Sequence, residues 1–222
     1  MKARVQDLSD RLVAKWTSPT GVELMAAGAV VVDGLLRHGP LSPEKAGELL
    51  GWPADEVLSR FHAMKFDLET EAETGVETWH GIQDSGPGSG DIVGAGVSLN
   101  SARPYSMELR GQRVYGWCVM DVLMFPVVFK EASSKVTGRC AATGVPVSLT
   151  VTPDGVRDLV PADAAVTLAP ATGADIREVF CDRVNFYATA DLARAAADRD
   201  PDLAVCSVAE AWSVGKRLAD LF

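Results

Sequence analysis

Apolar residues recur at helical spacing in the first third of the chain. The stretch AAGAVVVDGLLRHG at residues 26–39 predicts an apolar helix that ends at a glycine. LSPEKAGELLG at residues 41–51 then carries the signals of a second helix, with Ser42 as N-cap, proline in the first helical position and Gly51 after the last turn. A third helix is expected after Pro53. Connections as short as these are typical of a helix-turn-helix or winged-helix unit.

Such a unit raises the question of DNA binding, and its charges argue against it. Residues 40–70 hold six acidic residues and three basic ones. A recognition helix normally needs the opposite balance, because it approaches a polyanion. We therefore interpret the unit as a scaffold. The acidic residues are Glu44, Glu48, Asp55, Glu56, Asp67 and Glu69.

Beyond residue 90 the pattern changes to the alternation of apolar and polar residues that is typical of strands. A turn is expected at Arg110 to Gln112, and the sequence Pro153-Asp154-Gly155 ends another strand. The apolar spacing of SVAEAWSVGKRLADLF, at residues 207–222, predicts an amphipathic C-terminal helix. The expected strands lie within residues 92–100, 105–117, 145–151, 164–170 and 184–190.

An acidic and then glycine- and serine-rich stretch at residues 71–90 separates the two patterns and is typical of an exposed loop or linker. Helices before it, and mixed strands and helices after it, predict an α+β fold. We expect an N-terminal helical, winged-helix-like domain at residues 1–80. A mixed α/β domain with a small antiparallel-rich sheet is expected at residues 81–222.

Composition and charge limit the partners of the chain. Its 222 residues carry a formal net charge of −9, and the mean hydropathy of +0.09 is that of an ordinary globular protein. This charge argues against nucleic-acid and anionic-membrane partners. The N-terminus lacks the pattern of a secretory signal, and the longest apolar run is interrupted by Asp33 and too short to span a bilayer. A cytoplasmic location is therefore expected.

One apolar segment holds two residues that could carry chemistry. In WCVMDVLMFP, residues 117–126, Cys118 and Asp121 are three positions apart, which would place both on one face of a helix. A carboxylate among apolar side chains is costly unless it is paired or protonated. The pattern indicates a reactive pair, in which apolar neighbours raise the pKa of the carboxyl group until it can exchange protons.

The other cysteines differ in their surroundings. The chain has no CxxC pair and no sign of export, so neither disulfide bonds nor a structural zinc site are expected. We interpret Cys140 and Cys206 as packing residues. Cys181, in EVFCDRVNFYA, lies at the entry to a strand beside Arg183, whose charge would favour a thiolate. No histidine lies in a motif that would make it the base of a nucleophilic cysteine, whereas two thiolates and a carboxylate suit a soft metal ion.

Three segments in this order, WCVMDVLMFP, RCAATGVPVSLTVTP and DIREVFCDRVNFYA, resemble the organomercurial lyases, also called alkylmercury lyases. The resemblance runs from about residue 91 to the C-terminus, and the N-terminal region is similar more loosely. It implies protonolysis of the carbon–mercury bond of alkyl- and arylmercury compounds, which gives a hydrocarbon and Hg(II). It also implies that Cys118 and Cys181 are the sulfur ligands of mercury, that Asp121 carries the proton, and that Cys140 is structural.

The same resemblance implies no cofactor, because mercury enters as the substrate, and it makes small thiols or a mercuric reductase the acceptor of Hg(II). The loop at residues 71–90 looks longer than in the family, and Cys206 is an additional thiol without an assigned role. Two alternatives stay open: a thiol-based soft-metal sensor whose N-terminal unit reads DNA, and a mercury-binding protein without lyase activity.

Overall fold

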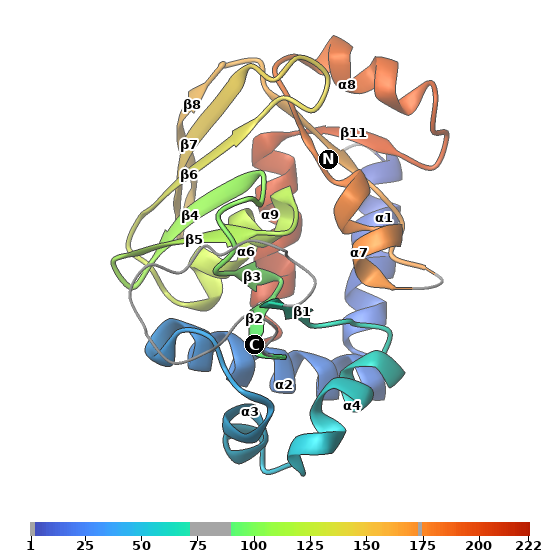
Figure 1. Cartoon of the computed structure of the whole chain (residues 1–222). Coiled ribbons are helices and arrows are strands. Elements are labelled where there is room, and N and C mark those ends of the chain that lie inside the picture. The colour runs from blue at the N-terminus through green and yellow to red at the C-terminus, as the bar shows by residue number, and fades with distance from the viewer. Residues whose placement is uncertain (1–2, 72–89, 173–174) are drawn as a thin grey trace.

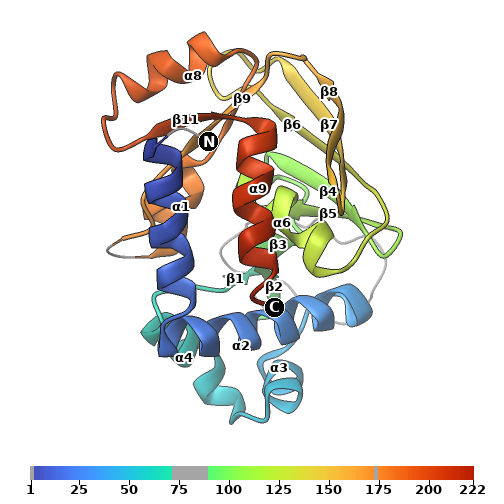
Figure 2. The same cartoon turned by 180° about the vertical axis from the view of Figure 1, so that it is seen from behind.

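The N-terminal helices form the base and one side of the molecule in the computed structural model, which describes residues 3–71, 90–172 and 175–222. Helix α1 stands beside the C-terminal helix α9, and α2 runs across below them, with α3 and α4 lowest (Figures 1 and 2). The bounds of these elements are α1 Ala3–Trp16, α2 Pro19–His38, α3 Pro43–Leu50, the 3₁₀ turn η1 Ala54–Glu56 and α4 Val57–Ala63.

The local signals that predicted α3 are the ones that shape it. The Ser42 hydroxyl accepts a hydrogen bond from the backbone nitrogen of Lys45 and thereby caps the helix. Gly51 follows the last turn in the left-handed conformation, with φ of 69°, which a side chain would disfavour. The helix expected after Pro53 is also confirmed, as η1 followed by α4. Helix α1 was not expected from the sequence.

Helix α2 is longer than the sequence pattern indicated. The Ser18 hydroxyl accepts a hydrogen bond from the backbone nitrogen of Gly21, so the helix begins at Pro19 and runs for 20 residues. The expectation that this apolar stretch is too short to span a bilayer was therefore wrong. Among the described residues, α2 is the one helix that is long enough and apolar enough to cross a membrane, judged by length and composition alone. Half of that apolar window is buried inside the protein, which is also a property of core helices.

Two sheets make up the β-structure of the described residues, and all of their strand pairs are antiparallel. The larger has eight strands in the order β1-β2-β3-β5-β4-β6-β7-β8, and the smaller has the order β10-β9-β11. The bounds are β1 Glu69–Thr70, β2 Ile92–Ala95, β3 Val97–Ser98, β4 Tyr105–Leu109, β5 Gln112–Gly116, β6 Ser134–Arg139, β7 Pro146–Thr152, β8 Gly155–Val160, β9 Ala165–Leu168, β10 Phe186–Tyr187 and β11 Ala204–Ser207.

The α+β class and the antiparallel pairing are confirmed, but the larger sheet is not small. Sequence patterns missed β6 because its buried side includes Ser134 and Gly138, which carry little apolar signal. They missed β8 because this edge strand is largely exposed and needs no apolar alternation. The turn expected at Arg110 to Gln112 does connect β4 and β5.

Helix α6 lies between the larger sheet and helix α9, as Figure 2 shows. One apolar core runs from Val5 in α1 to Leu218 in α9 and includes residues on both sides of the linker. The domain boundary expected at residues 80 and 81, and most of the loop expected at 71–90, lie outside the described residues. The remaining bounds are α6 Val119–Val128, α7 Ile176–Val179, the 3₁₀ turn η2 Cys181–Arg183, α8 Ala190–Ala197 and α9 Val208–Ala219.

Candidate active site

Cys118 and Asp121 meet at the start of α6. Cys118 is the N-cap of this helix and Asp121 is its third residue. The Oδ2 atom of Asp121 accepts a hydrogen bond of 2.8 Å from the backbone nitrogen of Cys118, as in a capping box. The expectation that both lie on one helical face is thus corrected. Their side chains converge because the chain turns at the cap, with Cys118 in an extended conformation before the helix begins.

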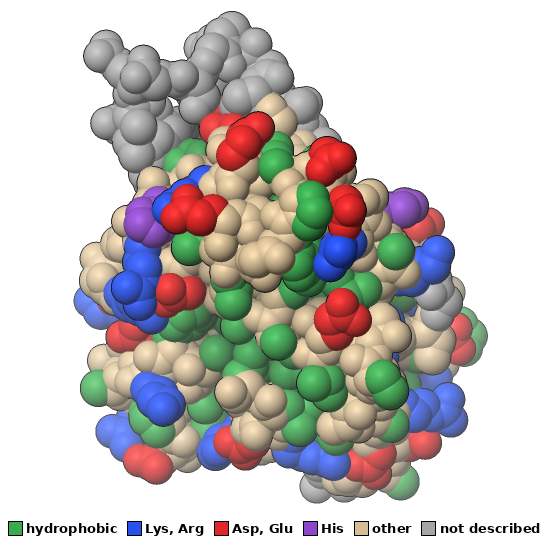
Figure 3. Space-filling model, turned by 90° about the horizontal axis from the view of Figure 1, so that it is seen from below, with side chains coloured by type: hydrophobic (Ala, Val, Ile, Leu, Met, Phe, Trp, Pro, Cys, Tyr) green, Lys and Arg blue, Asp and Glu red, His purple; other side chains and the backbone are tan. Residues whose placement is uncertain are grey.

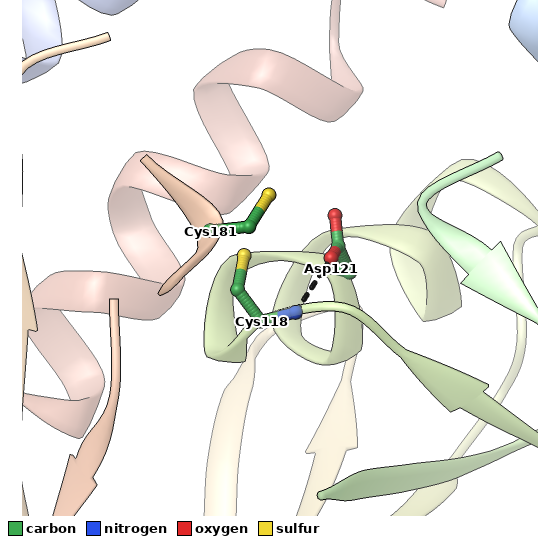
Figure 4. A group of neighbouring side chains, drawn as sticks. All are labelled: Cys118, Asp121 and Cys181. Atoms are coloured by element: carbon green, nitrogen blue, oxygen red, sulfur yellow. Dashed lines mark hydrogen bonds between the residues drawn. The ribbon is translucent and has the colours of Figure 1, made fainter. Parts of the chain in front are cut away.

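Cys181 joins this pair from a distant part of the chain. Figure 4 shows its sulfur beside that of Cys118, with the carboxyl group of Asp121 next to them. The two sulfur atoms and a carboxylate oxygen all lie within 4.8 Å of one another, and the three residues are buried. A backbone hydrogen bond of 3.2 Å from Val119 to Val184 ties the start of α6 to the segment after η2. The structure therefore brings all three candidate residues together.

Burial governs the protonation of the three groups. It raises the pKa of Asp121 to about 7, although hydrogen bonds from Cys118 and the charge of Arg103 act in the opposite direction. Burial likewise raises the pKa of Cys118 well above its usual range. For Cys181 the hydrogen bond with Cys118 lowers the pKa, but burial and nearby carboxylates outweigh it and the pKa is raised. The thiols are therefore protonated near neutral pH, and Asp121 can both accept and release a proton.

An apolar pocket adjoins Asp121 and Cys181. Its volume of about 80 Å³ exceeds the roughly 10–15 Å³ that a single water needs, so a small organic group fits. Trp117, Met124 and Phe125, the apolar neighbours in the sequence, do line it. Residues from the N-terminal part of the chain, which sequence reasoning missed, line it as well. Figure 3 shows apolar side chains gathered in the middle of the lower face, with charged side chains mainly around them. The N-terminal contributors are Leu12, Trp16, Leu24, Met25, Gly28 and Phe66.

A buried carboxylate lies behind the pocket wall. Glu69 in β1 is fully buried, and its Oε2 accepts a hydrogen bond of 2.8 Å from the indole nitrogen of Trp117. Its Oε1 accepts hydrogen bonds from Arg103 and Asn100. Sequence reasoning counted Glu69 among the acidic residues of the helical unit and missed this position, because no local pattern signals its distant partners.

The other two cysteines lie elsewhere. Cys206 in β11 is buried and donates a hydrogen bond of 3.6 Å to the carbonyl oxygen of Val166. Cys140 is buried in a separate apolar cluster that also contains Tyr187 and Ala193. Neither belongs to the cluster of Cys118, Asp121 and Cys181. These surroundings agree with the interpretation of both as packing residues.

Comparison with known proteins assigns the chain to a family. The family model described as alkylmercury lyase matches residues 100–220. The chain is also 35% identical to the alkylmercury lyase of Pseudomonas putida over 186 residues, which cover 83% of this chain and 79% of that protein. The chain belongs to the alkylmercury lyase family. The matched region contains Cys118, Asp121 and Cys181, whereas the pocket of this family member also draws on α1 and α2.

Further relatives agree. The alkylmercury lyase of Streptomyces lividans is 39% identical over 132 residues, which cover 59% of this chain and 60% of that protein. The alkylmercury lyase of Bacillus cereus is 29% identical over 182 residues, which cover 78% of this chain and 83% of that protein. A solved structure described as the crystal structure of the mercury-bound form of MerB2 superposes with a TM-score of 0.71 over 99% of both chains. At 17% sequence identity this likeness establishes a shared fold.

Proposed function

We propose that this protein is an organomercurial lyase, which cleaves the carbon–mercury bond of alkyl- and arylmercury compounds by protonolysis to a hydrocarbon and Hg(II). The observation that carries the proposal is the buried cluster of two thiols and a carboxyl group beside an apolar pocket, in a member of this family. Thiolate sulfur selects soft ions such as mercury, and a carboxyl group with a raised pKa can deliver a proton. The apolar pocket suits the organic group.

The reaction begins with thiol exchange on the incoming mercury. A substrate R–Hg–SR′ gives up its external thiolate as one enzyme cysteine forms a sulfur–mercury bond, and the proton of that cysteine leaves with R′SH. The second cysteine then binds mercury and transfers its proton to Asp121. A carboxylate with a pKa of about 7 accepts this proton readily near neutral pH. Cys118 and Cys181 are the two cysteines in this scheme.

Cleavage follows when two thiolates hold the mercury. They push electron density towards the carbon, which takes the electron pair of the breaking carbon–mercury bond and the proton of Asp121. The products are R–H and mercury bound to Cys118 and Cys181, with Asp121 again a carboxylate. The two thiol protons of the enzyme therefore end in R′SH and R–H. The scheme balances with substrate and protein alone, so we propose that no cofactor takes part and that mercury enters only as substrate.

Product release needs a thiol from outside the site. We propose that small thiols or a mercuric reductase remove Hg(II), since thiol exchange reverses the binding step. The net charge of −9 supports the further proposals that neither nucleic acid nor a membrane is a partner. A cytoplasmic location, where small thiols are abundant, stays a prediction of the same scheme.

The organisation of the chain also belongs to the proposal. We propose that residues 1–80 form a winged-helix-like domain and residues 81–222 the catalytic domain. Helices α2, α3 and α4 followed by β1 support the winged-helix assignment, and β1 forms an antiparallel pair with β2 of the second domain. An isolated bridge between Leu41 and Ile92 adds the short connection from the helices to this pair. In this organisation the first domain supplies one wall of the substrate pocket.

Headspace gas chromatography for benzene tests the function. The reduced protein is mixed with phenylmercury and excess small thiol, beside an Asp121→Asn variant that keeps an oxygen to cap α6. Benzene from the wild type, with a rate at least about 100-fold lower from the variant, is the expected result. Mercury that stays bound with no benzene from either protein would instead identify a mercury-binding or sensing protein.

A further inference from the structure

The carboxylate of Glu69 faces hydrogen-bond donors on both of its oxygens. Oε2 accepts from Trp117 Nε1 at 2.8 Å. Oε1 accepts from Asn100 Nδ2 at 3.0 Å and from Arg103 Nε at 3.1 Å, and Arg103 Nη2 lies 3.0 Å away as an ion pair. Burial raises the pKa of Glu69, but the hydrogen bond from Asn100 and the charge of Arg103 outweigh it and the pKa is lowered. An ionised carboxylate satisfies these donors together, whereas an amide would turn an NH₂ group towards one set of them.

The residue that Glu69 holds is part of the reactive site. Trp117 directly precedes Cys118, and its ring lines the substrate pocket. Its backbone nitrogen donates to the carbonyl oxygen of Gly96 at 3.1 Å, which fixes the main chain. This backbone bond does not fix the rotation of the Trp117 side chain. The indole nitrogen of Trp117 donates its hydrogen bond to Glu69.

Packing holds the faces of the indole ring, and the hydrogen bond to Glu69 holds its N–H edge. The ring of Phe66 lies 5.2 Å from the Trp117 ring, and the guanidinium carbons of Arg177 and Arg103 lie 5.0 Å and 5.9 Å from the ring centre. All three are contacts with the ring faces, and an indole turned over about its side-chain bond would offer the same faces with its N–H on the other side. A hydrogen bond at the ring nitrogen selects one of these two orientations. Glu69 also keeps Arg103 in place, since it binds two atoms of the guanidinium group.

We propose that Glu69 is a positioning residue for carbon–mercury cleavage, because its carboxylate fixes the indole of Trp117 as the wall against which the organic group of the substrate lies. This inference rests on the proposed function. A fixed wall matters most for a large, flat organic group, whose carbon must reach the proton on Asp121. Methylmercury contacts little of the wall, so its cleavage depends less on the orientation of the indole.

The first test compares kcat/KM for phenylmercury and methylmercury in Glu69→Gln and in a matched control, Glu48→Gln. Glu48 carries the same side chain on the surface, where 70% of it is exposed. We expect the ratio of phenylmercury to methylmercury kcat/KM to fall about tenfold in Glu69→Gln, since misplacements of about 1 Å can cost up to about 100-fold. The control should keep the wild-type ratio. A Glu69→Gln enzyme that loses activity on both substrates equally would reduce Glu69 to a fold-stabilising residue and overturn the proposal.

A second variant keeps the proposal testable if Glu69→Gln does not fold. Trp117 is replaced by β-(3-benzothienyl)alanine, which has nearly the shape of tryptophan and no N–H donor. The same tenfold fall in the substrate ratio is expected, because the bond to Glu69 is lost while the ring remains. An unchanged ratio would overturn the proposal. In soluble Glu69→Gln protein, the ¹H–¹⁵N resonance of the Trp117 indole should also move, and an unmoved resonance would count against the anchor.

The design separates this inference from the function on which it rests. A wild-type protein that releases no hydrocarbon from either substrate refutes the lyase function. A wild-type protein that cleaves both, with variants that keep the wild-type substrate ratio, refutes the anchor alone.

Discussion

The buried positions of Cys118, Cys181 and Asp121 make protonation the central property at the scale of single residues. Burial raises the pKa of all three groups, because an ionised form in apolar surroundings loses hydration. Both thiols are therefore neutral near pH 7, while Asp121, with a pKa of about 7, is present in both forms. Two neutral thiols beside an ionised Asp121 are the form of the site from which the proposed scheme starts. In this scheme protons move as the sulfur–mercury bonds form and again as the carbon–mercury bond breaks. In the proposed scheme, the energetic cost of burying Asp121 is what allows this carboxyl group to carry a proton near neutral pH.

That cost should appear in the stability of the protein. Asp121 keeps its proton up to a pH of about 7 in the fold and up to about 3.9 in the unfolded chain. Between these values the folded state binds more protons, so wild-type stability falls as the pH rises. The Asn side chain of Asp121→Asn cannot ionise, so the variant does not share this loss. We expect the free energy of unfolding of the variant minus that of wild type to increase by up to about 1.4 kcal/mol per pH unit between pH 4 and 7. Urea unfolding at pH 5 and pH 7 measures this, and a constant difference between the proteins would contradict it.

The proposal that Cys118 and Cys181 are the sulfur ligands of mercury predicts a contrast between two buried cysteines, Cys181 and Cys206. Cys181→Ser replaces a soft ligand by a hard hydroxyl that stays protonated, so benzene release from phenylmercury should fall at least about 100-fold. Cys206→Ser changes a thiol of β11 outside the cluster and should keep most of the activity. Both are measured by gas chromatography with excess thiol. Turnover retained by Cys181→Ser would refute the two-thiolate scheme.

At the scale of elements, the site depends on how closely the larger sheet approaches helix α6. Gly96, between β2 and β3, has φ of 81°, and a Cβ there would lie 3.2 Å from the ring of Phe125 and 3.5 Å from Oδ1 of Asp121. The glycine thus lets the sheet approach α6 in a conformation that other residues rarely adopt. Helix α2 shows the opposite case. A Cβ on Gly28, which lines the pocket, would meet no atom within 4 Å apart from its chain neighbours and the nearby backbone of its own helix.

Gly28 therefore predicts opposite effects on stability and substrate size. Gly28→Ala should raise the free energy of unfolding by about 0.5–1 kcal/mol, since glycine is unfavourable inside a helix and the new methyl group has room. Gly28→Leu should extend into the pocket and lower kcat/KM for phenylmercury about tenfold more than for methylmercury. Urea unfolding and the two substrate assays check these results. Equal losses on both substrates in a folded Gly28→Leu protein would contradict the pocket position of this residue.

At the scale of the whole molecule, one apolar core is shared by the N-terminal helices and the rest of the chain. One apolar cluster joins α1 and α2 to the sheet, α6 and α9, and the pocket lies where these parts meet. A chain with such a core is expected to unfold as one unit, because neither part can leave without exposing the other. The active site should then be lost in the same transition as the N-terminal helices.

This can be followed with 5-fluorotryptophan. Trp52 packs against Phe61 at 5.7 Å in the N-terminal part, and Trp212 belongs to α9. Their ¹⁹F resonances, assigned by single substitutions, should report the same urea midpoint. Two clearly separated midpoints would show that the parts unfold independently.

Short-range signals explain what could be predicted from the sequence. The cap of α3 and the α+β class follow from spacing and residue type alone, because they depend on neighbours a few positions apart. The pairing of Cys118 with Asp121 is of the same kind, even though the capping geometry differs from the helical face that was expected. Three short segments further sufficed to indicate the family.

Only the tertiary structure decided the rest. It placed Cys181 beside Cys118, gave α1 and α2 a share in the pocket, and set Glu69 under Trp117, 48 positions away in the sequence. The tertiary structure also decided the strands with a weak apolar pattern, such as β6 and β8. These features arise from contacts between segments that are remote along the chain, and local periodicity carries no information on which remote segments will meet.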